Sequence, residues 1–104
     1  MTFEEFVEKS EAEVEDYEYE AMEAYYEEAG GDYYEEWSEF ETAFRDAYAG
    51  EYDDLTEYAA EIVEQTIDLD KLPQIIRYHI DYGGIARDLS YEGYRCYNGY
   101  VFYP

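Results

Sequence analysis

Carboxylates are the side chains in this sequence that could do chemistry, and residues 4 to 28 alone hold twelve Asp or Glu and one Lys. Closely spaced carboxylates can act as general acid and base, or they can bind hard cations. Such pairs occur along much of the chain, so none stands out as a catalytic dyad. Asp68-Leu69-Asp70 begins like a calcium-binding EF-hand loop, but the sixth-position Gly and the distal Glu are missing. We therefore expect adventitious binding of divalent cations and no specific metal site.

Two other residue types could be reactive, and each occurs once. His79 lies among isoleucines, where a histidine is usually a packed or partnered side chain and not a base. Cys96 follows Arg95 in an apolar stretch and fits a small core residue. The chain has no glycine-rich phosphate loop and no HExxH, CxxC or GxSxG motif. The sequence thus predicts neither an enzyme nor a cofactor.

The charge balance indicates what kind of partner the chain could have. It has 29 acidic and 6 basic residues and a formal net charge of -23. Residues 1 to 54 carry 21 acidic and 2 basic residues, whereas residues 55 to 104 carry 8 and 4. Such a charge repels nucleic acids and anionic membranes and attracts a basic surface. A cation buffer, adaptation to high salt and mimicry of DNA are three uses for it.

The redox compartment follows from the cysteine count. A single cysteine excludes an intrachain disulfide and fits a reducing compartment. The acidic N-terminus does not resemble a signal peptide, and no apolar run approaches the roughly 20 residues needed to span a bilayer. We expect a cytoplasmic protein.

The densest acidic stretch, Thr2 to Gly30, predicts one continuous helix. Thr2 and Glu5 form a capping-box signature, and Gly30-Gly31 is a stop signal. Apolar or small residues recur in steps of four and three: Phe3, Val7, Ser10, Val14, Tyr17, Ala21 and Ala24. At about 1.5 Å per residue, the helix would carry one carboxylate per roughly 3 Å, close to the roughly 3.4 Å phosphate spacing of one DNA strand. A merely solvated acidic face remains an alternative, whereas the regular seam argues against a disordered tail.

Three further helices are predicted downstream. Asp32 with Glu35 could cap a helix that ends at Gly50 and packs an aromatic stripe of Trp37, Phe40, Phe44 and Ala47/Tyr48 against the first helix. Asp54 and Glu57 repeat the capping box for a helix over about residues 55 to 66. After a connector, Pro73 suits the start of a short helix that holds Ile75, Ile76, His79 and Ile80. Asp81 could cap a further turn or two up to Leu89.

The last fifteen residues change character and predict a β-hairpin. Asn98-Gly99 is the strongest short-range hairpin turn signal, and it separates two aromatic runs, residues 94 to 97 and 100 to 103. Two strands alone are marginal in water, so the hairpin should lie on the helices or pair with another chain.

Several blocks resemble the ArdA family of antirestriction proteins. They are Phe44-Arg45-Asp46-Ala47-Tyr48-Ala49-Gly50-Glu51-Tyr52, Tyr78-His79-Ile80-Asp81-Tyr82, Ala86-Arg87-Asp88-Leu89 and Gly99-Tyr100-Val101-Phe102. The resemblance covers about residues 40 to 104 well and 23 to 40 loosely. It implies an elongated DNA mimic that dimerises through its C-terminal part and inhibits type I restriction-modification enzymes. An additional N-terminal domain usual in the family is replaced here by the acidic helix, so a shortened mimic with another target, such as a CRISPR effector, is an alternative.

These observations together predict a mainly helical α+β fold. Residues 1 to 50 would form an acidic helical hairpin, and residues 51 to 104 would form a C-terminal unit of helices and a β-hairpin. The function predicted is inhibition of a host defence enzyme in the bacterial cytoplasm by competition for its DNA-binding groove, by a protein from a phage or mobile element. A dimerising interaction module that does not mimic DNA is the rival from another class.

The residues predicted to carry this function fall into two sets. The target-binding acidic set is Glu4, Glu8, Glu11, Glu15, Glu18, Glu20, Glu23, Glu27, Glu35, Glu39, Asp46, Glu51 and Asp53. A homodimer interface in the less acidic half would use Ile75, Ile76, Tyr78, Ile80, Tyr82, Tyr94, Tyr97, Tyr100 and Phe102. Arg87 is expected to be structural, paired with a carboxylate such as Asp81 or Asp88 within the chain or across the dimer.

Overall fold

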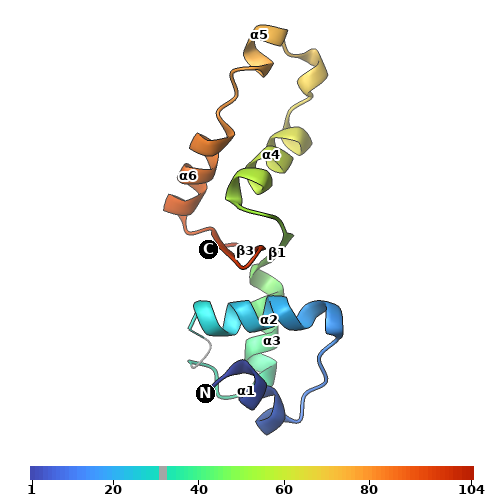
Figure 1. The fold of residues 1–104 in the computed structure, drawn as a ribbon, viewed down its shortest axis with the longest axis vertical. Helices are drawn as coiled ribbons and strands as arrows, with labels where there is room; N and C mark the ends of the chain where they lie inside the picture. The colour runs from blue at the N-terminus through green and yellow to red at the C-terminus, as the bar shows by residue number, and fades with distance from the viewer. Residues whose placement is uncertain (31–32) are drawn as a thin grey trace.

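The computed structural model of the chain describes residues 1–30 and 33–104 and has a long, narrow body, with Cα extents of 56 × 24 × 18 Å. Figure 1 shows three layers along the long axis. Helices α1 to α3 form one end, a small sheet forms the middle, and α4 to α6 form the other end. The predicted α+β class with mainly helical content is confirmed.

The prediction of one continuous helix over residues 2 to 30 is wrong. Helix α1 spans Phe3–Ser10 and α2 spans Asp16–Glu28, and between them Glu11 has a left-handed φ of 53°. A continuous helix would hold Phe3 about 34 Å from Tyr26 at about 1.5 Å per residue. The break instead brings their ring centroids to 5.7 Å. Burial of Phe3 and Phe6, worth roughly 1.5–3 kcal/mol each, outweighs the about 1–2 kcal/mol cost of left-handed Glu11.

The start of the acidic segment, residues 2 to 30, agrees with the prediction, whereas its end differs. The capping box at the start is confirmed, because the Glu5 amide donates to the Thr2 hydroxyl and the Glu5 carboxylate accepts from the Thr2 amide. Helix α2 ends at Glu28, two residues before Gly30. The predicted roles of Gly31 and Asp32 lie outside the described residues. On the predicted seam, Tyr17 is 80% exposed and does not pack inward.

Helix α3 spans Trp37–Ala47 and carries the predicted aromatic stripe. Phe40 and Phe44 are fully buried, and the Trp37 ring lies 6.0 Å from that of Phe3 and 5.6 Å from that of Phe6. Packing of this stripe against the N-terminal acidic segment is therefore confirmed, and the contact is made with α1 as well as with α2.

A strand that was not predicted follows α3 directly. Helix α3 ends at Ala47, and β1 spans Tyr48–Glu51, so Gly50 is not a helix stop. Gly50 has a φ of +133°, at a point where the strand's register shifts by one residue. Only glycine adopts that backbone readily, and it marks a bulge in the strand.

The predicted hairpin is confirmed, and β1 completes it as a third strand. Strands β2 (Arg95–Tyr97) and β3 (Tyr100–Phe102) are antiparallel, and the sheet order is β1-β3-β2. Asn98 and Gly99 both have positive φ, as a two-residue type I′ turn requires. Because β3 is central, Val101 and Phe102 are 0% and 2% exposed. The sheet is thus covered by its own chain.

The helix predicted over residues 55 to 66 is confirmed as α4, Leu55–Thr66. The Glu57 amide donates to the Asp54 carboxylate at 2.9 Å, while the Glu57 carboxylate accepts from the Asp53 amide. The connector that follows contains a short 3-10 turn, η2, at Leu69–Lys71.

The next two helices differ in length from the prediction. Helix α5 spans only Gln74–Arg77, so His79 and Ile80 lie beyond its end. Helix α6 spans Tyr82–Glu92 and packs beside α4. The carboxylate of Asp81 caps α6 by accepting from the Gly84 amide at 2.9 Å. A Cβ atom at Gly84 would lie 2.6 Å from an Asp81 oxygen, so a side chain at that position would force the capping carboxylate to shift.

The buried phenols predict loss of stability at alkaline pH. Burial and a hydrogen bond to Glu20 raise the pKa of Tyr100 to about 12, and burial with a hydrogen bond to Tyr34 raises that of Tyr25 to about 12. The folded state holds these protons longer than the unfolded state, whose phenols ionise near pH 10. The contribution of these two phenols to the free energy of unfolding is therefore complete below about pH 10 and is lost as the pH rises towards about 12. The urea midpoint of unfolding should be the same at pH 7 and pH 9 and should fall at pH 10.5 and pH 11.5. The fall should be smaller in Tyr100→Phe.

Candidate acidic interaction surface

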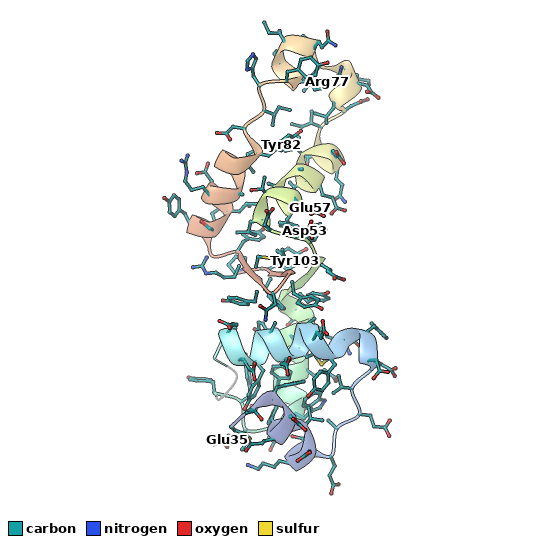
Figure 2. All side chains as sticks on the ribbon, in the orientation of Figure 1. Glu35, Asp53, Glu57, Arg77, Tyr82 and Tyr103 are labelled. Carbon is teal, nitrogen blue, oxygen red and sulfur yellow. The ribbon has the colours of Figure 1, made fainter. Side chains whose placement is uncertain are left out.

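The predicted acidic set is spread over the lower part of the molecule, from α1 to the start of α4. Eleven of its thirteen members are exposed, and Glu18 and Glu23 are half-buried. By element, Glu4 and Glu8 lie on α1; Glu11 and Glu15 cap α1 and α2; Glu18, Glu20, Glu23 and Glu27 lie on α2; Glu35 precedes α3; Glu39 and Asp46 lie on α3; Glu51 lies on β1; and Asp53 precedes α4. Figure 2 shows Glu35 near one end of the molecule and Asp53 near its middle.

Helix α4 extends this acidic surface into the half that was predicted to be less acidic. Glu57, Glu61 and Glu64 are spaced four and three residues apart, which places them on one face of the helix. Glu57 and Glu64 are exposed, and Glu61 accepts hydrogen bonds from Gln65 and from Tyr52, which raises the Tyr52 pKa to about 12. The four- and three-residue spacing is a sequence signal for this stripe, although the predicted acidic set ends at Asp53.

The basic side chains mostly bind groups of their own chain. Arg45 donates from Nη1 to Glu18 Oε2 at 2.8 Å, and Arg95 donates to the carbonyl of Ser90 at 2.7 Å. Arg77 lies 3.5 Å from an Asp70 oxygen. The surface around the acidic side chains is therefore left with little positive charge of its own.

The expected pairing of Arg87 with a carboxylate is not found within the described part of the chain, and pairing across a dimer stays a prediction. Within residues 1–30 and 33–104 the exposed Arg87 side chain has no ion pair. Asp81 is engaged by the amide of Gly84 as the cap of α6, and Asp88 is the next residue along the helix, where neighbouring side chains diverge. Within the chain, Arg45 joins α3 to α2 through its ion pair with Glu18.

Arg45 and Arg87 are matched arginines with different expected effects on stability. Arg45→Ala removes two hydrogen bonds from the guanidinium to the Glu18 carboxylate, at 2.8 and 3.4 Å. The Arg45 side chain is about half exposed. After screening by solvent we expect a loss of about 0.5–1 kcal/mol, or a few degrees in melting temperature, that shrinks in high salt. Arg87→Ala should melt like the parent chain. Thermal unfolding followed by circular dichroism at two salt concentrations checks both, and an equal loss in the two variants would contradict this assignment.

The residues predicted for a dimer interface are in very different environments. Tyr100 and Phe102 are buried in the chain's own core, where the Phe102 ring lies 4.9 Å from that of Tyr25. The half-buried members are Ile80, Tyr82, Tyr94 and Tyr97. The most exposed members lie on and just after α5: Ile75, Ile76 and Tyr78, with exposed fractions of 71%, 53% and 71%. The exposed members of the predicted set thus lie at the end of the molecule farthest from α1.

In the part of the chain that the structure describes, no group of three or more His, Cys, Asp or Glu side chains is placed to hold a metal ion. Of the helices in those residues, none has the length and apolar character needed to cross a membrane.

In a comparison with protein families, residues 2–102 match the antirestriction protein family ArdA. The match extends beyond the blocks near residues 40 to 104 that suggested the resemblance and includes α1 and α2. Comparisons with curated proteins and with solved structures gave no match. Since the family match covers nearly all of an elongated, acidic chain, the chain belongs to the ArdA family of antirestriction proteins.

Proposed function

We propose that the chain inhibits a type I restriction-modification enzyme by occupying the enzyme's DNA-binding groove in place of DNA. The observation that carries this proposal is the distribution of acidic side chains along a narrow body. A net charge of -23 over 56 Å is one net charge per about 2.4 Å, compared with one per about 1.7 Å for duplex DNA. The long axis would span about 16 base pairs, or about one and a half helical turns.

The internal pairing of the basic residues supports the same proposal. A groove that binds DNA is lined with Lys and Arg, which contact phosphates. DNA itself carries no positively charged groups that would repel these side chains. Here Arg45, Arg77 and Arg95 are held by groups of their own chain, so a basic groove would meet mainly carboxylates. The acidic faces of α2 and α4 would then stand in for phosphates.

Inhibition assays with purified enzymes test the proposed target and mode together. Cleavage of unmodified plasmid by a type I restriction enzyme should fall as the chain is added, and the half-inhibitory concentration should rise in proportion to the DNA concentration. A type II endonuclease and a CRISPR nuclease serve as comparison enzymes. Inhibition that does not depend on DNA concentration would contradict competition for the groove, and inhibition of the CRISPR nuclease alone would contradict the type I target.

We further propose a homodimer formed through the exposed apolar end, defined by Ile67, Ile75, Ile76 and Tyr78. Residues 1 to 54 carry a net charge of -19 and residues 55 to 104 a net charge of -4, so association through the α5 end involves the least repulsion. Two-fold symmetry would place the two acidic ends far apart and lengthen the acidic rod. The partner proposed for this patch is therefore a second copy of the chain.

The dimer is tested by sedimentation at micromolar concentration and physiological salt. The parent chain should sediment as a dimer, and a variant with Ile75→Lys and Ile76→Lys as a monomer with an unchanged circular dichroism spectrum. Tyr91→Lys is a control, because Tyr91 is 79% exposed on α6 and lies outside the patch. A monomeric parent, or a control that dissociates equally, would overturn this interface.

A further inference from the structure

Helix α1 folds back on the body at a bend that its own sequence does not require. The segment between α1 and α2, residues 11 to 15, reads Glu-Ala-Glu-Val-Glu and contains neither Gly nor Pro. Its first residue nevertheless has the left-handed φ of 53°, a conformation that a residue with a side chain adopts at a cost. Contacts made elsewhere by α1 must therefore hold the bend in place.

The contacts that dock α1 are aromatic. Phe3 and Phe6 are buried, and each ring lies 5.7 Å from that of Phe40. Both also contact Trp37, the one tryptophan of the chain, at centroid distances of 6.0 and 5.6 Å. Undocking of α1 would remove two neighbouring rings from Trp37, so this side chain is a built-in reporter of the position of α1.

Docking of α1 also brings like charges together. Tyr19 on α2 lies 5.2 Å from the Phe3 ring, and its pKa is raised by burial and then by the carboxylates of Glu23, Glu4, Glu27 and Glu8. Glu4 and Glu8 belong to α1, whereas Glu23 and Glu27 belong to α2. Carboxylates of both helices thus act on the same side chain at this contact, and repulsion between the two acidic helices opposes the docking that the rings favour.

We propose that α1 is a charge-gated latch, docked on Trp37 when counter-charge screens the carboxylates of α1 and α2 and released when they are unscreened. The Debye length falls from about 30 Å at 0.01 M salt to about 8 Å at 0.15 M, so the repulsion changes strongly over an accessible range. Binding of a polycation and docking of α1 are then linked, and each favours the other. When a basic partner surface binds the carboxylates of α1 and α2, it would favour docking of α1 on the aromatic cluster. The latch does not depend on which protein supplies that surface.

Acrylamide quenching of Trp37 fluorescence measures the latch directly in the full chain. In the parent, the quenching constant should fall by at least about twofold between 0.01 and 0.15 M salt, and micromolar spermine at low salt should have the same effect. A variant with Glu4→Gln and Glu8→Gln should already be protected at 0.01 M. A variant with Glu64→Gln and Glu92→Gln changes the net charge equally but on α4 and α6, and it should behave like the parent.

Hydrogen exchange in the same samples separates release of α1 from unfolding of the whole chain. Amides of α4 should keep their protection at low salt while those of α1 lose it. A parent quenching constant that is the same at both salt concentrations would overturn the latch. So would equal protection of Trp37 in the two double variants, or loss of protection in α4 together with α1.

Discussion

Replacing Glu15, Glu27, Asp46 and Glu51 by lysine is expected to weaken inhibition of the target enzyme by at least about 30-fold. The four side chains are exposed, lie on or cap α2, α3 and β1, and have no ion pair within the described residues. An exposed charge pair contributes about 0.2–1 kcal/mol, and reversal turns attraction into repulsion, so the four changes together should cost at least about 2 kcal/mol. Titrated inhibition of plasmid cleavage gives the change in potency.

A charge series at the same four positions provides the control. Three glutamines and one asparagine change the net charge from -23 to -19, and four lysines change it to -15. Potency should fall in that order while the circular dichroism spectra and melting temperatures stay close to the parent's. Full potency of the lysine variant would exclude a functional role for this part of the acidic surface.

Replacing Phe40 by alanine should have the largest effect on stability. Phe40 is fully buried, and its ring contacts seven others: Phe3, Phe6, Tyr25, Tyr26, Tyr34, Trp37 and Phe44. Buried Phe→Ala substitutions cost about 3–5 kcal/mol, a large part of the about 5–15 kcal/mol by which small domains are stable. The melting temperature should fall by about 12 °C or more.

Tyr17→Ala is the matched control, because it also removes an aromatic ring from the N-terminal helices. Tyr17 is 80% exposed, so its replacement should change the free energy of unfolding by less than about 0.5 kcal/mol. Differential scanning calorimetry of both variants checks the contrast. Similar melting temperatures for Phe40→Ala and Tyr17→Ala would show that the aromatic cluster does not hold the acidic end together.

Elements with local signals could be predicted from the sequence. The bounds of α4 follow from the cap at Asp54, and the hairpin follows from Asn98-Gly99, whose positive φ values suit only certain residues. The exposure of most of the acidic set follows from the cost of burying a charge. These features depend on neighbours within a few residues.

Features that depend on distant partners could not be predicted in this way. Strand β1 exists because Tyr48 pairs with Phe102, and Gly50 alone looked like the end of a helix. The break after α1 depends on rings of α3 that are more than thirty residues away from Phe3 in sequence. Glu18 and Arg45 are 27 residues apart in sequence, so nothing local showed that one member of the acidic set is paired. The division of the chain near residue 50 stays a prediction, and β1 spans that point.

Displacement of DNA from the target enzyme tests the central claim most directly. Fluorescence anisotropy of a labelled duplex bound to a type I restriction enzyme would be followed while the chain is added at 50, 100 and 200 mM salt. If the chain competes with DNA for the groove, it should displace the duplex completely, and the chain and the duplex should never occupy the same enzyme molecule together. The affinity of the enzyme for the chain should fall steeply over this salt range, as its affinity for DNA does. A ternary complex in which the duplex stays bound while the chain inhibits cleavage would contradict it.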